Sequence, residues 1–349
     1  QTSLKLEEPF EDFAYRFSEI SGTVVLLSGG TLDCARYHIL ATKPWLFFSG
    51  RHRDLTIATQ RNTVSLRDNP FTVLGRIMHT LHFPHAGGPA PVGAGLFGYL
   101  SYDLKDSLET LPRTCVDTHG LPHICLYAPS IIVVHDKRTT STRLLIPLGD
   151  HPKPQVPDRI LLEFERTLSA TPNKADGKTT TGELQSNFTR NRYVNAVNRV
   201  QEYIASGDVY QVNISQCFQA AFSGDPFALF KQMFRQNPAP FFAYINAGDH
   251  HIVSTSPERF IWQNGKYVET RPIKGTRPRG SHPREDHALK QELEQSQKDE
   301  AELSMIVDLL RNDLGKVCVP GSVQVKRHKR VEAYRNVYHL VSIIEGLLR

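Results

Sequence analysis

The sequence predicts an α+β fold built on antiparallel sheets. Hairpin signals outnumber strand–helix–strand signals along the chain. The clearest is Asn264-Gly265, which stands between the apolar runs 260–262 and 267–268. Short strand-like runs also recur through residues 1–150. A doubly wound parallel sheet would alternate its strands with helices, and this pattern is absent.

Composition narrows the class of protein. The chain has 349 residues and a net charge of +5, and its Lys and Arg residues are scattered rather than striped. This distribution favours an anionic ligand over a nucleic-acid partner. Its five cysteines are odd in number and lack metal-ligand spacing, which indicates a reduced, cytoplasmic protein. No run is long and apolar enough to span a membrane, so no membrane partner is expected.

Residues 1–150 form the first expected region. Its predicted elements are a helix over 74–81 and strands at 23–27, 45–48, 124–127, 131–134 and 142–146. Residues 93–98 match GxGxxG, but a loop precedes them and no helix follows. Glycines packed at a strand crossing explain the pattern better than a dinucleotide site.

Residues 151–186 read as a helix near 160–168 followed by a polar linker, and residues 187–349 as a second region. Thr189 is expected to cap a helix that ends at Gly207. A strand over 208–215 should follow, with Gln211 on its polar face. That face can line a cleft or simply meet water.

The stretch 271–276 places Lys274 between a proline and a glycine at the open end of the hairpin. With Asn264-Gly265 as the turn, Pro257 faces Pro272, and neither proline can donate a ladder hydrogen bond. Regular pairing should therefore fail there, with Glu258 on the opposite arm. An acid and an amine close together suggest a catalytic pair, whereas an ordinary surface lysine is the simpler alternative.

A carboxylate lies beside the expected apolar stripe of a later helix. Ser296 to Asp299 has capping-box spacing, and the stripe is expected at four positions, Met305, Ile306, Leu309 and Leu310. Glu302 falls on its edge, one turn after Asp299. Two acids at this spacing can bind Mg²⁺ through oxygen and water, or pair with Arg or Lys.

Several motifs together resemble the chorismate-utilising enzymes, and most closely the aminodeoxychorismate synthase component I group. The resemblance covers nearly the whole chain in order. It rests on the segments 95–99, 207–213, 237–241, 256–260, 272–276, 305–313 and 339–342. It implies two antiparallel β-sheets packed face to face with helices outside, as in anthranilate synthase component I.

The resemblance also implies roles for individual residues. Lys274 matches a nucleophile and Glu258 a general acid. Glu302 matches a Mg²⁺ ligand, with Asp299 beside it. Four residues match positions near the substrate: Gln211, Gly275, Thr276 and His339. Four others match a tryptophan pocket of the family: Leu26, Ser28, Pro240 and Phe241.

Lys274 distinguishes the branches of this family. The related anthranilate synthases carry alanine there, and the isochorismate and salicylate synthases carry a lysine base where this chain has Gln211. The resemblance therefore implies an aminating subunit that makes 4-amino-4-deoxychorismate from chorismate for p-aminobenzoate and folate synthesis. Ammonia would come from a separate glutaminase subunit. The alternatives are an anthranilate synthase component I or an inactive fragment that keeps a docking surface.

The resemblance implies one large departure. The family continues for roughly another hundred residues beyond the equivalent of Arg349, a length within ordinary domain sizes. That part supplies a Gly-rich substrate segment and a second Mg²⁺ ligand. The chain is therefore expected to be truncated at its C-terminus, with an incomplete active site.

Overall fold

The computed structural model describes residues 2–81, 93–112, 117–147, 157–170 and 179–349. Contacts within the chain define two compact units. The larger joins Gln1–Pro172 to Leu229–Arg349, and the smaller is Asn173–Ala228. The division at residues 150 and 186 groups the chain by motif and stays a prediction. Most of the expected polar linker, at 171–178, lies outside the described residues.

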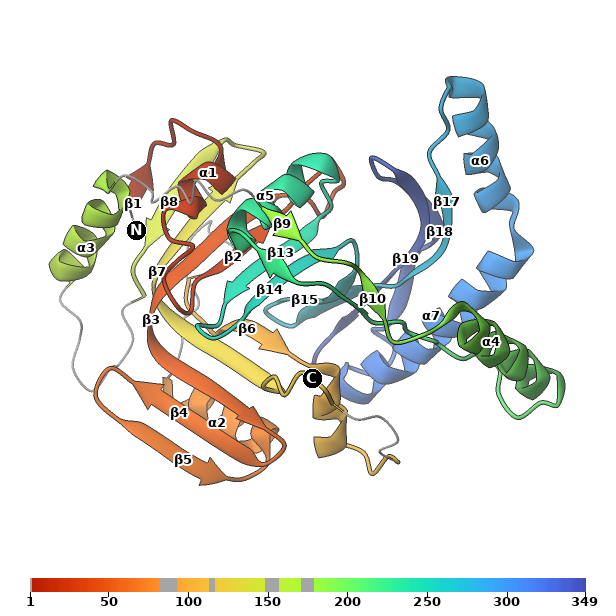
Figure 1. Cartoon of the computed structure of the whole chain (residues 1–349), viewed down its shortest axis with the longest axis horizontal. Helices are drawn as coiled ribbons and strands as arrows, with labels where there is room; N and C mark the ends of the chain where they lie inside the picture. Colours follow the sequence, from red (N-terminus) through yellow and green to blue (C-terminus); the bar gives the residue numbers. More distant parts are fainter. Residues whose placement is uncertain (1, 82–92, 113–116, 148–156, 171–178) are drawn as a thin grey trace. The chain divides into compact units, whose positions relative to one another are not determined.

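A ten-stranded antiparallel sheet forms the first layer of the larger unit. Its central order is β1 (Thr2–Leu4), β8 (Ser141–Leu145), β7 (Ile124–Asp136), β3 (Tyr37–Arg51), β2 (Val24–Leu27), β13 (Phe241–Asn246) and β14 (His251–Ser256). Three further strands pair at its margin: β4 (Asp54–Thr59), β5 (Thr63–Arg67) and β6 (Phe97–Leu100). Strands from residues 2–145 and from residues 241–256 thus share one sheet (Figure 1).

Apolar side chains on the two faces of this sheet form separate clusters. One cluster gathers around Tyr127 and Ile132, and the other around Phe48 and Leu126. Burial of both faces explains why β7 is almost uniformly apolar rather than alternating. Helices α1 (Phe10–Tyr15), α2 (Pro70–Leu81) and α3 (Pro157–Ser169), and the 3₁₀ helix η1 (Tyr102–Ser107), belong to the same unit.

Gly98 is required where β6 crosses β7. A Cβ atom at this position would lie 1.9 Å from the backbone oxygen of Cys125, and the residue has φ of +152°. Only glycine permits so close an approach between two backbones. The structure therefore supports glycine packing for this end of the GxGxxG pattern.

We expect Gly98→Ala to lower the free energy of unfolding by about 3 kcal/mol, because the clash is with backbone and the conformation is strained. Gly75→Ala is the matched control. Gly75 lies within α2 with open space around its Cα, and alanine should stabilise the helix by about 0.5–1 kcal/mol. Urea unfolding of both variants measures the two effects. Equal stability of the Gly98 variant and the parent protein would contradict the argument.

The second layer of the larger unit is a five-stranded antiparallel sheet. It contains β15 (Arg259–Asn264), β16 (Tyr267–Arg271), β19 (Val337–Leu347), β17 (Ile273–Pro278) and β18 (Gln324–Ala333). Helices α6 (Pro283–Gln295) and α7 (Gln297–Val317) cover one face (Figure 1). Leu293, Leu303, Val307 and Leu314 pack from these helices onto the sheet.

The expected apolar stripe of α7 is wrong at two of its four positions. Met305 and Leu309 are 47% and 54% exposed, whereas Leu303, Val307 and Leu314 are buried. Both sets satisfy helical spacing, so periodicity alone could not choose between them. The sheet decided the rotation of the helix, because Leu303, Val307 and Leu314 pack into its apolar cluster while Leu310 packs only at the margin of that cluster.

The hairpin exists, but its turn is displaced by one residue from the prediction. Asn264 pairs with Tyr267, so Gly265 and Lys266 form the loop, and Gly265 has φ of +57°. The register then shifts between Arg259 and Trp262. Without this shift Arg259 would lie opposite Pro272, whereas it pairs with Arg271.

The smaller unit contains α4 (Arg190–Ala205) and the two-residue strands β9 (Thr180–Thr181), β10 (Gln185–Ser186), β11 (Phe218–Gln219) and β12 (Phe222–Ser223). Thr189 caps α4 as expected, accepting a hydrogen bond from the Arg192 N–H. The predicted strand over 208–215 is not formed. A strand needs a hydrogen-bonded partner, and none pairs with this segment among the described residues. Helix α5 (Pro226–Gln236) begins at the end of this unit.

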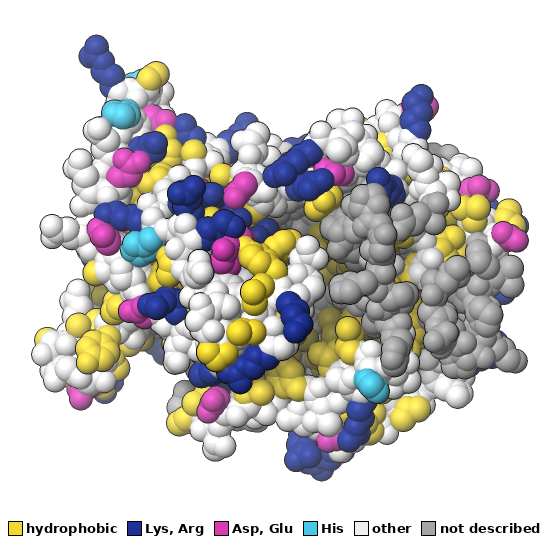
Figure 2. All heavy atoms as spheres, turned by 180° about the vertical axis from the view of Figure 1, so that it is seen from behind, with side chains coloured by type: hydrophobic (Ala, Val, Ile, Leu, Met, Phe, Trp, Pro, Cys, Tyr) yellow, Lys and Arg dark blue, Asp and Glu magenta, His cyan; other side chains and the backbone are white. Residues whose placement is uncertain are grey.

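The predicted α+β class with antiparallel sheets is confirmed. Among the described residues, no helix is long and apolar enough to cross a membrane. The four described cysteines, Cys34, Cys125, Cys217 and Cys318, are free. Figure 2 shows the Lys and Arg side chains of one face in several separate groups, some of them beside acidic side chains.

Candidate active site

A bulge in β17 is the centre of the candidate site. Lys274 pairs with Leu340 of β19 and Thr276 with His339, so Gly275 is the extra residue. Gly275 has φ of +68°, and a Cβ atom there would lie 3.0 Å from the Cβ of Asp299. Glycine is therefore required both by the left-handed conformation and by the close approach to α7. The bulge brings the Lys274–Thr276 segment against the first turn of that helix.

Glu258 lies at the same end of the sheet. Its Oε1 accepts a hydrogen bond of 3.0 Å from the backbone N–H of Ile273, the residue before Lys274. The Glu258 N–H in turn donates to the Ser256 hydroxyl. Alternation along ideal strands would have separated the acid from the lysine. The irregular pairing around Pro257 and Pro272 instead brings the carboxylate to the lysine-bearing strand.

His339 and Thr276 form the second pair in the site. The Thr276 hydroxyl and Nδ1 of His339 are 3.0 Å apart. Burial lowers the pKa of His339, while the Gly275 backbone and the carboxylates of Glu332 and Glu258 oppose this effect. A neutral imidazole can both accept and donate a hydrogen bond, which suits a group beside an uncharged part of a substrate.

Lys274 itself makes no ion pair with another residue in the described part of the chain. It is half-buried. Its Nζ is not held by a carboxylate of the described residues, and it stays available to contact a bound substrate. The chemistry of a nucleophile is therefore open to it.

Asp299 and Glu302, the expected Mg²⁺ ligands, begin α7. Asp299 is buried, and its Oδ2 receives a hydrogen bond of 3.2 Å from Nη2 of Arg277. Its backbone N–H bonds the Ser296 hydroxyl, as the capping pattern predicted. Glu302 is half-buried one turn later. Two carboxylates fit Mg²⁺, which keeps several waters and takes few protein ligands, although Arg277 already holds one oxygen of Asp299.

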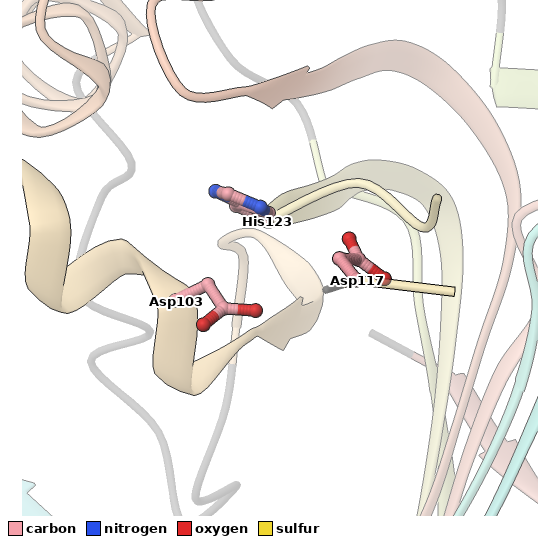
Figure 3. Close-up of side chains that lie close together, drawn as sticks. All are labelled: Asp103, Asp117 and His123. Atoms are coloured by element: carbon pink, nitrogen blue, oxygen red, sulfur yellow. The ribbon is translucent and has the colours of Figure 1, made fainter. Parts of the chain in front are cut away.

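A different group of potential ligands lies elsewhere in the larger unit. Asp103 of η1, Asp117 of a loop and His123 before β7 place their ligand atoms within 4.8 Å of one another (Figure 3). Asp117 is paired with Arg51, Asp103 with Lys105, and Nδ1 of His123 accepts the His52 N–H. Each member already has a partner, so we assign no metal to this group.

The residues expected to form a secondary pocket come together between β2 and β13. Leu26 pairs with Ala243, and the Ser28 hydroxyl donates to the Pro240 carbonyl at 2.8 Å. A cavity of about 280 Å³ lies nearby, lined by Pro238, Ala239 and Phe242 as well as by His339. The proximity agrees with the expected arrangement, and a ligand for Leu26, Ser28, Pro240 and Phe241 stays a prediction.

His38 supports this region from β3. Its Nδ1 accepts the Ser28 N–H at 3.1 Å, and burial, with smaller effects from Lys137 and His135, lowers its pKa to about 3. In the unfolded chain the His38 imidazole takes up a proton below about pH 6.5, whereas in the folded chain it stays neutral down to about pH 3. The free energy of unfolding therefore falls as the pH drops from 6.5 towards 3, by about 2 kcal/mol at pH 5.

We expect His38→Asn to lose most of this acid sensitivity, because the amide oxygen replaces Nδ1 as acceptor and does not titrate. Urea unfolding at pH 7 and pH 5 measures it. His287→Asn, at an exposed position of α6, is the control and should retain the sensitivity of the parent protein. Identical pH dependence in the two variants would refute the assignment.

Two parts of the site fall outside these contacts. Gln211 belongs to the smaller unit, on the segment that forms no strand, and its role beside a substrate stays a prediction. Sequence reasoning also missed the buried polar residues behind the hairpin, among them the charged Glu269 and Arg271 and the neutral Tyr334. An acid and an arginine two positions apart on a strand share one face, and this spacing was the available signal.

Comparison with known proteins identifies the class. The family model for chorismate binding enzymes matches residues 40–349, and the chain belongs to this family. It is 39% identical to aminodeoxychorismate synthase component 1 of Salmonella typhimurium over 90% of this chain and 67% of that protein. It is 36% identical to anthranilate synthase component 1 of Thermus thermophilus over 82% of this chain and 65% of that protein.

A solved structure agrees with these relatives. Anthranilate synthase component I from Streptococcus pneumoniae superposes with a TM-score of 0.77 and 25% identity, covering 92% of this chain and 70% of that one. The chain therefore spans about two thirds of the length of the relatives it matches.

Proposed function

We propose that this chain is part of an aminating subunit that converts chorismate and ammonia to 4-amino-4-deoxychorismate. The observation that carries the proposal is Lys274, which has no ion pair among the described residues and follows the backbone amide that binds Glu258. The resemblance implies alanine at this position in anthranilate synthases. Relatives named aminodeoxychorismate synthase component 1 support the proposal, with 39% and 34% identity.

Each residue then has a defined task. The Lys274 amine forms a bond to C2 of chorismate through its nitrogen lone pair while the ring double bond shifts and the C4 hydroxyl leaves. Glu258 gives its proton to that hydroxyl, which departs as water. Ammonia next forms a bond to C4, and the bond between lysine and C2 breaks, which returns the free amine. Thr276 and His339 hold the substrate from β17 and β19.

Mg²⁺ would be held by Glu302, with Asp299 as the second carboxylate. When bound, the ion neutralises a substrate carboxylate and so lowers repulsion between a dianion and the acidic groups of the site. Arg277 keeps Asp299 oriented towards the bulge of β17.

The proposed reaction needs a source of ammonia and a pathway that uses its product. Ammonia would be delivered by a separate glutaminase subunit, and the product would feed p-aminobenzoate and folate synthesis in the cytoplasm. A second candidate, anthranilate synthesis, is favoured by the 36% identity to an anthranilate synthase component 1. An inactive fragment with a docking surface is the non-enzymatic alternative.

The test uses a protein that contains this chain together with the remaining length present in its relatives. It is incubated with chorismate, Mg²⁺ and ammonium, and the products are weighed by mass spectrometry. Aminodeoxychorismate retains the enolpyruvyl group, whereas anthranilate has lost it and is fluorescent. Anthranilate as the main product would reject the proposal in favour of the second candidate. No turnover of chorismate would favour the non-enzymatic alternative.

A further inference from the structure

Asp33 is shared by two arginines from the second sheet. Its Oδ1 accepts hydrogen bonds of 2.8 Å from Nη1 of Arg271 and of 2.8 Å from Nη2 of Arg330. These two hydrogen bonds lower the pKa of Asp33 against the opposing effect of its partial burial. Asp33 lies on the loop between β2 and β3, so one carboxylate connects the first sheet to β16 and β18 of the second.

The first arm from Asp33 runs through Arg271. Arg271 donates from Nε to Glu269 at 2.7 Å, and Arg259 donates to the same Glu269 oxygen. The guanidinium of Arg259 also lies 5.7 Å from the centre of the Trp262 ring. This arm ends on the residue that directly follows Glu258.

The second arm runs through Arg330. Its Nε donates to Glu332 at 3.1 Å, and the Tyr334 hydroxyl lies 3.1 Å from the other oxygen of that carboxylate. The same hydroxyl is 3.4 Å from the carbonyl of Pro257, and the Tyr334 ring packs edge-on against His339 at 5.0 Å. This arm ends on the residue that directly precedes Glu258.

The loop that carries Asp33 is itself held in place. The Lys137 ammonium donates to three of its carbonyls, those of Ser28, Gly30 and Ala35, at 2.6–3.2 Å. Arg138 donates to the carbonyl of Asp33 at 3.0 Å. Because this loop is held in place, the Asp33 carboxylate can fix the positions of the two arginine side chains.

We propose that Asp33 is a positioning residue for Glu258, acting through both arms. The proposal rests on the proposed function. Glu269 and Glu332 are only 5% and 4% exposed, and burying such charges is a poor way to gain stability, because their desolvation offsets their attraction. What a fully paired network does supply is a defined geometry. Here the two arms fix the positions of Pro257 and Arg259, the residues on either side of Glu258.

Asp33→Asn keeps the size of the side chain and removes its charge, so both arginines lose an ionic partner. We expect kcat to fall about 10- to 100-fold with KM within about twofold, since small misplacements of a reacting group cost this much. The hydrogen bond from the Ile273 N–H to Glu258 should weaken as well. Hydrogen exchange at the Ile273 amide should then accelerate about tenfold.

Asp117→Asn is the matched control, because it also breaks an ion pair of the first sheet, that with Arg51 of β3, but touches neither arm and not the loop that carries Asp33. It should leave kcat and Ile273 exchange unchanged. Tyr334→Phe removes the hydroxyl that contacts Glu332 and Pro257 at the end of the second arm, and it should reproduce a smaller part of both effects even if the Asp33 variant folds poorly.

Equal behaviour of the Asp33 and Asp117 variants, or unaltered Ile273 exchange in Asp33→Asn, would overturn the proposal. If the parent protein makes no aminated product, the proposed function fails. Ile273 exchange then still decides whether Asp33 positions Glu258, because it needs no substrate.

Discussion

Lys274→Ala should reduce the rate of aminodeoxychorismate formation about a thousandfold or more. Loss of a nucleophile removes the covalent route, and a factor of a thousand corresponds to about 4 kcal/mol of transition-state stabilisation. Ammonia can still attack the ring directly, so the remaining product should shift towards attack at C2. Steady-state rates and product masses with chorismate, Mg²⁺ and ammonium measure both effects.

The fold should survive this change, because the Lys274 side chain is only half-buried. Its pairing with Leu340 of β19 uses backbone groups, which alanine retains. Lys266→Ala is the control. Lys266 is an exposed lysine in the β15–β16 loop of the same sheet, and its removal should leave rate and melting temperature unchanged. A Lys274 variant with the parental rate would remove this lysine from the mechanism, and the reaction would then depend on Glu258 and the metal.

Glu258→Gln should lower kcat about 100- to 1,000-fold, the usual contribution of a positioned general acid. Glutamine can still accept the Ile273 N–H but has no proton of suitable acidity for the leaving hydroxyl. Because the ground-state contacts persist, KM should change little.

Glu294→Gln provides the comparison. Glu294 is a half-exposed glutamate of α6 that pairs with Lys290 one turn away, and such surface pairs contribute little. Its kcat should equal that of the parent protein. If the two glutamate variants retained similar activity, the leaving hydroxyl would have to receive its proton from another source.

Local signals in the sequence were sufficient to predict structure wherever the contacts of a segment are with residues close to it in the chain. The cap at Thr189, the cap at Ser296 and the pairing of β7 with β8 follow directly from neighbouring residues. The hairpin was placed correctly but its loop was wrong by one residue, because the bulge in β15 is set by its partner strands. The motifs that carry the family resemblance also occur along the chain in the order typical of the family, so they could be recognised without a structure.

Contacts between distant segments could not be deduced in this way. The sequence by itself determined the α+β class, the chorismate-binding family and the candidate residues Lys274 and Glu258. Only the tertiary structure decided which face of α7 is buried, that segment 208–215 has no partner, and that Asp33 contacts Arg271 and Arg330. The physical reason is that burial and ion pairing depend on what another part of the chain presents, while periodicity and capping depend only on near neighbours.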